Sequence, residues 1–332
     1  MESRHPLFLF IYKSFYIYQT DNPPIVPPLL STGLKTSAQF VVDMLLQQGI
    51  RAALAEAKDQ NSIQALVDQY QPSRVVLEAI WVTPAKMQSL VAANPGVRWT
   101  VRVHSELTFL SNEGMAVGWL LAYAAMGIEI AFNSNLTTAN WNETFGAVTC
   151  LPNYYPLRQP RAPLPKQETL NIGCFGSIRP LKNQLMQACA ALSFARDEGR
   201  PLQFHMNAGR VEQLGANNLK NIQAALGSAL VLHPWLGHEE FLELIAQMEI
   251  CLQVSLTESF NICSADAVSI GVPLIGSAAI SWLPRRSQAP VDDVGGIVLA
   301  MQRAGRTTVH MNHEALENYL ATAKKTWLRW AA

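Results

Sequence analysis

The chain has 332 residues, 49% of them hydrophobic and 15% charged, and its formal net charge is zero. This composition is typical of a folded globular protein and excludes a disordered or fibrous one. The zero net charge supplies no overall attraction to nucleic acid or to an anionic membrane. The length favours two domains of roughly 150 residues, each able to bury its own core.

The first half alternates short apolar runs with helical periodicity, which is typical of an α/β protein with parallel sheets. The apolar run 7–12 is too short to cross a membrane and no small-residue cleavage site follows it, so we expect a buried strand. Further strands are expected at 51–54, 74–78, 98–104 and 128–133, and helices at 37–48, 62–69, 84–93 and 115–125.

Small residues follow the first expected strand, in the loop that contains Ser31, Thr32 and Gly33. Such residues let the backbone approach a ligand, so this loop is a candidate for donor or acceptor binding. An equally good interpretation is a flexible loop that ends in a helix N-cap at Thr36 or Ser37.

His104 ends the strand expected at 98–104. Ligands of open α/β sheets bind beyond the carboxyl ends of strands, so His104 is a candidate functional residue. The alternative is a structural histidine, which is the commoner situation for a single histidine.

Prolines at 152, 156, 160, 163 and 165 mark a domain boundary, since they can continue neither a helix nor a central strand. We therefore expect a first domain over 1–155, a second over 166–310, and a C-terminal helix over 311–332 that packs back on the first domain. Strands of the second domain are expected at 170–175, 203–207, 230–232, 250–253 and 273–276, with helices at 183–198, 211–225, 238–246 and 259–270.

The segment Gly173–Asn183 runs from a strand through a glycine turn to a helix, and it carries Arg179 and Lys182. A guanidinium can hold phosphate oxygens with two parallel hydrogen bonds, and an ammonium adds a compact positive charge. The context favours a phosphate site over two solvated loop residues.

Glu258 and Asp266 lie eight positions apart, a little over two turns of a helix expected to begin near Ser259. Free N–H groups at that helix start, around Phe260, Asn261 and Ile262, suit a phosphate. Two carboxylates beside a phosphate site are what a nucleotide-sugar requires. Taken alone, the acids could also be a dipole-complementing residue and an ordinary helix-face residue.

The order of these motifs resembles the GT-B glycosyltransferases, and within them the retaining, family-4-like branch (glycosyl transferases group 1). The similarity covers nearly the whole chain and is strongest over residues 170–277. The matching segments are the Gly33 loop, His104, Leu151-Pro152-Asn153, Gly176–Asn183, Trp235-Leu236-Gly237, and Glu258 to Asp266 followed by Gly271-Val272-Pro273.

The resemblance implies two Rossmann-like domains that face each other across a cleft, and a retaining hexosyltransferase acting on a nucleotide-diphosphate sugar. It implies that Arg179 and Lys182 hold the diphosphate and that Glu258 and His104 contact the transferred sugar. The ribose and nucleotide would meet Asp266, which stands where the family usually has Glu, and the segment of Trp235 and Leu236.

No Asp-x-Asp motif is present, so we expect neither a metal nor another cofactor beyond the sugar donor. Ligand groups on both domains imply closure when the donor binds. Five cysteines in apolar surroundings, none with metal-ligand spacing, indicate reduced thiols in a cytoplasmic protein.

The acceptor stays open: a glycan, a lipid-linked molecule or a small molecule. Two further functions remain, a catalytically silent GT-B binding module and a viral-type enzyme that glucosylates a base of DNA. The basic-aromatic segment 324–330 would serve the latter, but a terminal amphipathic helix that packs its tryptophans inward is the favoured interpretation.

Overall fold

The structure is a computed structural model that describes residues 7–13, 33–162, 165, 167–212 and 214–332. Ser31 and Thr32 therefore lie outside the described residues. The chain divides into two compact units, which are described separately below. Unit 1 is Met1–Pro156 together with Leu320–Ala332, and unit 2 is Leu157–Tyr319.

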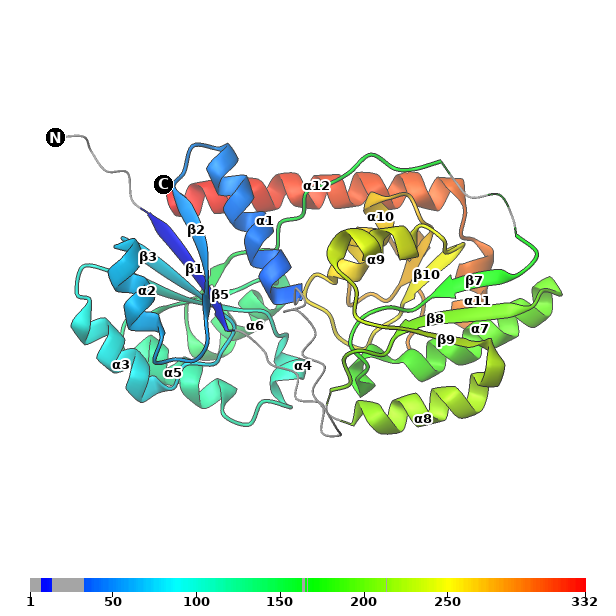
Figure 1. Cartoon of the computed structure of the whole chain (residues 1–332), viewed down its shortest axis with the longest axis horizontal. Helices are drawn as coiled ribbons and strands as arrows, with labels where there is room; N and C mark the ends of the chain where they lie inside the picture. Colours follow the sequence, from blue (N-terminus) through cyan, green and yellow to red (C-terminus); the bar gives the residue numbers. More distant parts are fainter. Residues whose placement is uncertain (1–6, 14–32, 163–164, 166, 213) are drawn as a thin grey trace. The chain divides into compact units, whose positions relative to one another are not determined.

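Unit 1 contains a parallel sheet in the order β2-β1-β3-β4-β5-β6 (Figure 1). The chain adds β2 on one side of β1 and then crosses to β3 on the other, which creates a topological switch point between β1 and β3. The strands are β1 Phe8–Lys13, β2 Ala52–Ala57, β3 Arg74–Glu78, β4 Arg98–Val103, β5 Glu129–Phe132 and β6 Thr149–Cys150.

Both faces of this sheet are buried, because alternate residues of its strands enter two different cores. Leu9 and Ile11 pack with α2, α3, α5 and α6, whereas Phe8 and Phe10 pack with α1 and the end of α12. The helices are α1 Gly33–Gln47, α2 Ile63–Tyr70, α3 Pro84–Ala93, α4 Leu107–Leu110, α5 Ala116–Ala125, α6 Asn135–Phe145 and α12 Arg306–Ala331.

The tryptophans near the C-terminus belong to the core of unit 1. Trp327 is fully buried, its ring lies 5.8 Å from that of Phe10, and its Nε1 donates to the carbonyl of Pro152 at 2.7 Å. The Trp330 ring packs on Phe8 and under the guanidinium of Arg74. These aromatic rings stabilise the fold rather than present a stacking surface for nucleic-acid bases.

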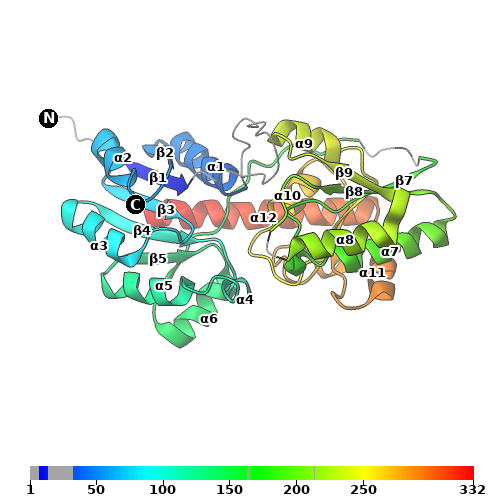
Figure 2. The same ribbon diagram turned by 60° about the horizontal axis from the view of Figure 1, so that its bottom comes forward.

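Unit 2 repeats the arrangement with a parallel sheet in the order β11-β10-β7-β8-β9 (Figure 2). Its switch point lies between β7 and β10. Helices α7, α8 and α11 cover one face of the sheet, and α9 and α10 lie on the other side. The strands are β7 Leu170–Gly173, β8 Leu202–Asn207, β9 Leu230–His233, β10 Ile250–Gln253 and β11 Leu274–Gly276; the helices are α7 Gln184–Glu198, α8 Gly215–Leu226, α9 His238–Ile245, α10 Ile262–Ser269 and α11 Val294–Gln302.

Residues 157–162, which we call the strap, are held against α9 and α10 within unit 2. The backbone N–H groups of Arg158 and Arg161 donate to Ser269 Oγ at 2.8 Å and to the Ile270 carbonyl at 2.9 Å. Their guanidinium groups form ion pairs with Glu239 and Glu243. From Leu157 onward the described part of the proline-rich segment belongs to the second unit.

Helix boundaries differ from expectation where tertiary contacts override local pattern. Helix α1 begins at Gly33, so neither Thr36 nor Ser37 is its N-cap. Helix α8 begins at Gly215 rather than at 211, because residues 210–212 run beside Ile178 in a short parallel bridge. The periodicity did not predict α6 or α11.

Candidate functional site

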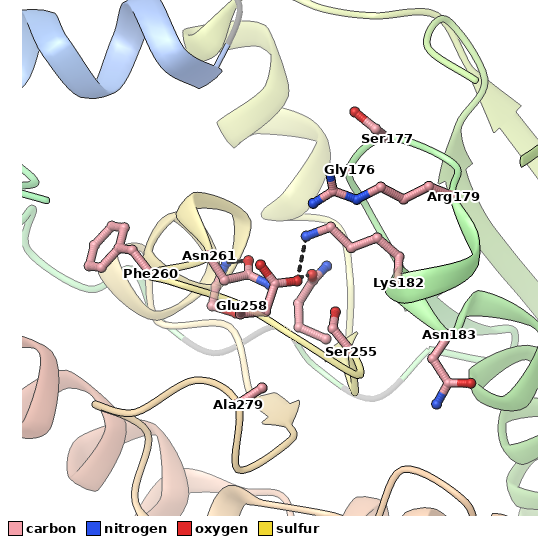
Figure 3. Close-up of polar contacts among 12 residues, drawn as sticks. Gly176, Ser177, Arg179, Lys182, Asn183, Ser255, Glu258, Phe260, Asn261 and Ala279 are labelled. Atoms are coloured by element: carbon pink, nitrogen blue, oxygen red, sulfur yellow. Dashed lines mark hydrogen bonds and ion pairs between the residues drawn. The ribbon is translucent and has the colours of Figure 1, made fainter. Parts of the chain in front are cut away.

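The candidate site of unit 2 lies at the switch point of its sheet, where β7 and β10 end side by side. Two loops leave this edge: residues 174–183 after β7 and residues 254–261 after β10. Ligands of doubly wound sheets bind at such a point because the loops diverge to either side of it. Both sequence-predicted clusters therefore meet at one edge of the sheet (Figure 3).

The loop after β7 is shaped by backbone that only certain residues tolerate. Gly176 has a φ of +113°, and its position lies against the side chains of Lys182 and Cys263. Asn183 also has a positive φ, 55°, and its amide donates to the carbonyls of Val254 and Val291 at 3.1 and 2.7 Å. This clamp fixes the loop that carries Arg179 and Lys182 against the one that follows β10.

Lys182 and Glu258 form an ion pair, with 2.5 Å between Nζ and Oε1, across 76 residues of sequence (Figure 3). The two side chains are only 12% and 6% exposed. The pair brings the predicted phosphate ligand next to the predicted sugar ligand. A ligand with an anionic group beside a hydroxyl could use both at once.

Arg179 lies beside a second pair of charged residues that the sequence analysis missed. Its Nη1 is 3.5 Å from Glu212, and Glu212 also pairs with Arg210. Arg210 and Glu212 follow β8 and are held next to Ile178 by two backbone hydrogen bonds of 2.9 Å. The signal in the sequence was a strand followed by Ala-Gly-Arg-Val-Glu, a second glycine turn with charged residues.

The helix start expected at Ser259 is wrong, because α10 begins at Ile262 with Asn261 as its N-cap. Glu258 therefore lies in the loop before the helix, and it does not share a helix face with Asp266. Phe260 is buried, with its ring against Trp282 and Tyr319, and Figure 3 shows it pointing away from Lys182. Ile262 is the first residue of the helix and keeps its predicted place at the N-terminus.

Asn261 explains the later start. Its φ is 61°, its Oδ1 accepts from the Ser264 N–H at 2.9 Å, and its Nδ2 donates to Gln253 Oε1 at 2.8 Å. The side chain thus caps the helix and fixes it to the end of β10. An amide that faces the sheet in this way has a structural role in addition to the predicted one near phosphate.

Asp266 is 2% exposed, and its Oδ1 lies 2.7 Å from Nε2 of His238, the first residue of α9. The hydrogen bond that His238 donates to the Asp266 carboxylate raises the pKa of His238. Trp235 and Leu236 lie between β9 and α9, separated from this histidine by Gly237, and both are half-buried. The acid predicted to bind ribose is thus engaged by an imidazole that the sequence analysis did not single out.

In unit 1 the predicted residue His104 follows β4, as expected, and its side chain is 16% exposed. Its Nε2 contacts the carboxylate of Glu78, the last residue of β3, and that carboxylate is also bound by Arg102 of β4. Burial, and then the charge of Arg102, lower the pKa of His104. Gly33 is the first residue of α1, and its predicted role in ligand binding stays a prediction.

Three absences hold for the described part of the chain. No group of three or more His, Cys, Asp or Glu side chains could hold a metal ion there. Among the same residues, no helix is long and apolar enough to cross a membrane. All five cysteines are described, and none of them forms a disulfide. Burial raises the pKa of the Cys263 thiol, which lies next to Lys182, to about 12.

Solved structures share this architecture. Sucrose-phosphate synthase from Thermosynechococcus elongatus is 15% identical, with a TM-score of 0.71 over 95% of this chain and 94% of that one. Anabaena HepE, solved with UDP and glucose, is 12% identical with a TM-score of 0.61 over 97% and 96%. The N-terminal domain of Candida albicans trehalose-6-phosphate phosphatase is 9% identical with a TM-score of 0.67 over 98% and 96%.

The chain has the GT-B fold. The expectation of two Rossmann-like domains, each with its own parallel sheet, is confirmed. At these identities the similarity establishes the fold alone. No protein-family model and no curated protein matches the chain.

Proposed function

We propose that the chain is a glycosyltransferase that moves a sugar from a nucleotide-diphosphate donor to an acceptor hydroxyl. The observation that carries this proposal is the Lys182–Glu258 ion pair at the switch point of unit 2. It joins a cation suited to a diphosphate and a carboxylate suited to sugar hydroxyls, at the edge where doubly wound sheets bind nucleotides. Two of the similar structures carry names that fit, a sucrose-phosphate synthase and a protein solved with UDP and glucose.

The charges nearby support departure of a nucleoside diphosphate. Arg179, Arg210 and Lys182 come from two neighbouring loops, and α10 begins beside them at Ile262. Cationic side chains and helix N-terminal N–H groups stabilise the negative charge that develops on a leaving diphosphate. We therefore propose that catalysis needs no divalent cation, and that activity persists in excess EDTA.

We further propose that transfer retains the anomeric configuration of the donor sugar and that Glu258 orients that sugar through its hydroxyls. His104 is proposed to contact the transferred sugar, and Asp266 to act on the ribose together with its partner His238. The anomeric configuration of the product, read from its proton NMR coupling constant, tests retention. An inverted product refutes it and leaves the donor site in place.

A thermal-shift screen of UDP-, GDP-, ADP- and TDP-sugars tests donor binding, since a ligand specific for the native state raises the melting temperature. For the wild-type chain we expect the donors with one particular nucleotide base to raise the melting temperature most. In Arg179→Met this increase should be lost. Arg196→Met, a change in the last turn of α7, is the matched control. The proposal fails if no nucleotide-diphosphate sugar shifts the melting temperature at millimolar concentration.

A silent binding module of the same fold is the second candidate. The fold also occurs in the N-terminal domain of a protein named as a phosphatase. In addition, both predicted acids are already engaged, Glu258 by Lys182 and Asp266 by His238. Slow release of free nucleoside diphosphate in the absence of acceptor separates the two. A transferase passes the donor sugar to water and releases the diphosphate, whereas a silent module binds the donor without turnover.

A further inference from the structure

Arg102 lies at the centre of a buried polar cluster in unit 1, and its guanidinium is fully buried. It donates from Nε to the Leu151 carbonyl at 2.9 Å, from Nη1 to both oxygens of Glu78 at 3.1 and 3.3 Å, and from Nη2 to Asn153 Oδ1 at 2.6 Å. A guanidinium has five donors and no acceptor, and it keeps its charge in proteins. Each group that forms a hydrogen bond with Arg102 must therefore present an acceptor to it.

Glu78 transmits this constraint to one nitrogen of His104. The carboxylate is fully buried and ionised: burial alone would favour its neutral form, but the charge of Arg102 holds its pKa below the usual value. An ionised carboxylate only accepts hydrogen bonds, so Nε2 of His104, which contacts Oε2, must carry a proton. Nη1 of Arg102, 3.4 Å from Nε2, is then a neighbour and not a hydrogen-bond donor to it.

Asn153 transmits the same constraint to the other nitrogen. Its Oδ1 is turned toward Arg102 and also accepts from Nδ2 of Asn133 at 3.1 Å. The orientation of the Asn133 amide is thereby fixed, and its NH₂ group lies 3.4 Å from Nδ1 of His104. A donor facing Nδ1 requires a lone pair there. The contacts through Glu78 and those through Asn153 and Asn133 therefore both favour the tautomer of His104 that is protonated at Nε2.

The backbone beside Glu78 supports a constrained arrangement. Ala79 has a φ of 70°, a left-handed conformation that costs free energy for a residue with a Cβ. Its N–H donates to the carbonyl of Arg102 at 2.8 Å. The turn that carries Glu78 is therefore tied to the same strand as the guanidinium. Buried ion pairs are weak stability devices, and strained backbone clusters at functional sites.

We infer that Arg102 is a positioning residue that fixes His104 as a neutral imidazole, with the proton on Nε2 and the lone pair on Nδ1. A ligand group that replaces the Asn133 amide at Nδ1 must then itself donate a hydrogen. Resting on the proposed function, this assigns a sugar hydroxyl to His104 and disfavours a carboxylate or a phosphate at that position. The cluster selects a neutral hexose donor over a uronic-acid donor.

Imidazole ¹⁵N NMR of the ligand-free, full-length protein tests the tautomer, with the His104 resonances assigned by their loss in His104→Asn. We expect one protonated nitrogen, identified as Nε2 by its couplings to both ring protons, and one lone-pair nitrogen. The pattern should persist from pH 7.5 to pH 5.5, since Glu78 and Arg102, the charged groups from β3 and β4 that face the ring, stay paired. A proton on Nδ1, or an imidazolium at pH 7, overturns the inference.

Glu78→Gln gives a sharper test. Nη1 of Arg102 faces both oxygen positions, so the amide oxygen of the new side chain can take the Oε2 position and accept from both Arg102 and Nε2 of His104. The proton should therefore stay on Nε2. Glu129→Gln is the matched control, because Glu129 is bound by Thr100 and Thr149 elsewhere on the same sheet. A proton on Nδ1 in a folded Glu78→Gln protein contradicts the role of Arg102.

If Glu78→Gln does not fold, Asn133→Asp tests the contacts through Asn153 and Asn133. A carboxylate opposite Nδ1 should convert His104 into an imidazolium at pH 7, and a neutral ring there overturns the inference. The NMR outcome does not depend on turnover, so failure of the proposed function and failure of this inference are distinguishable.

Discussion

Lys182→Met removes the ammonium of the Lys182–Glu258 pair while keeping an unbranched side chain of similar length. The pair is 12% and 6% exposed, so its net worth lies between that of an exposed pair, about 0–1 kcal/mol, and the 3–5 kcal/mol lost when a fully buried pair is broken. For the ligand, a charge-assisted hydrogen bond contributes about 1.5–3 kcal/mol. We therefore expect free nucleoside diphosphate to bind roughly 10- to 150-fold more weakly.

Glu258→Gln is the informative partner of this change. In the ligand-free structure Glu258 neutralises Lys182, so an amide at this position frees the ammonium for a diphosphate. Affinity for the free nucleoside diphosphate should stay equal or rise, whereas turnover of the sugar donor should fall sharply. Diphosphate affinity should thus fall in Lys182→Met but not in Glu258→Gln. This difference distinguishes a residue that binds phosphate from one that binds the sugar.

Isothermal titration with the nucleoside diphosphate, next to a coupled assay of its release, measures both quantities. Lys220→Met, an exposed lysine on α8, is the control and should bind as the wild type does. Unfolding by urea reports the loss of stability separately. Wild-type affinity in Lys182→Met, or equal losses of binding in both variants, would refute the assignment of these two side chains.

Three other predictions follow from contacts of unit 2. Arg179→Met should weaken diphosphate binding and Glu212→Gln should strengthen it, because Glu212 lies 3.5 Å from Arg179 and competes with the diphosphate for its guanidinium. Isothermal titration measures both affinities. A change of affinity in the same direction in both variants would contradict the reasoning. Burial and the neighbouring His233 lower the pKa of His205 to about 4, while an unfolded histidine titrates near 6.5, so the unfolded chain binds the proton first and stability falls from pH 6.5 to pH 4. Urea unfolding should detect a loss from His205 of at most about 3 kcal/mol, so the total loss should be smaller in His205→Asn and unchanged in the control His310→Asn. Asn261→Ala should lower the free energy of unfolding by about 1–3 kcal/mol, since it loses a cap and keeps a positive φ, and Asn261→Gly should cost less; equal losses would exclude backbone strain.

The alternation of strands and helices was predictable because buried parallel strands are short apolar runs that any reader of the sequence can find. Phe8, Phe10, Leu9 and Ile11 illustrate why: both faces are buried, so nearly every position is apolar. The loops after β7 and β10 were predictable for the same reason, since strand ends locate them.

The start of α10 was not predictable, because Ser259 and Asn261 are both good N-cap residues. Two tertiary contacts select Asn261: the hydrogen bond of its Nδ2 to Gln253 at the end of β10, and the burial of Phe260 against Trp282. Local propensity contains neither contact. Helix α6 was missed because its asparagines and threonines are poor helix formers, although the strand before its Ser134 cap was predicted.

The partners of the site residues were beyond sequence reasoning, although their positions were not. Glu212, His238 and Glu78 come from elements dozens of residues away from the side chains they bind. A sequence shows which residues follow strands, but it contains no rule for which carboxylate will meet which cation. The roles predicted for Arg179, Glu258 and Asp266 accordingly remain predictions.

The strap has a consequence for how the chain can be divided. Arg158 and Arg161 pair with Glu239 and Glu243, which are four residues apart on α9, so six residues of linker follow one side of a helix. A fragment that begins after the last proline of the linker would leave that side of α9 uncovered, with two glutamates without counter-ions and the Ser269 hydroxyl without its donor. Protease sites or fusion partners inserted before Leu157 spare these contacts, and insertions between Arg158 and Arg161 break them.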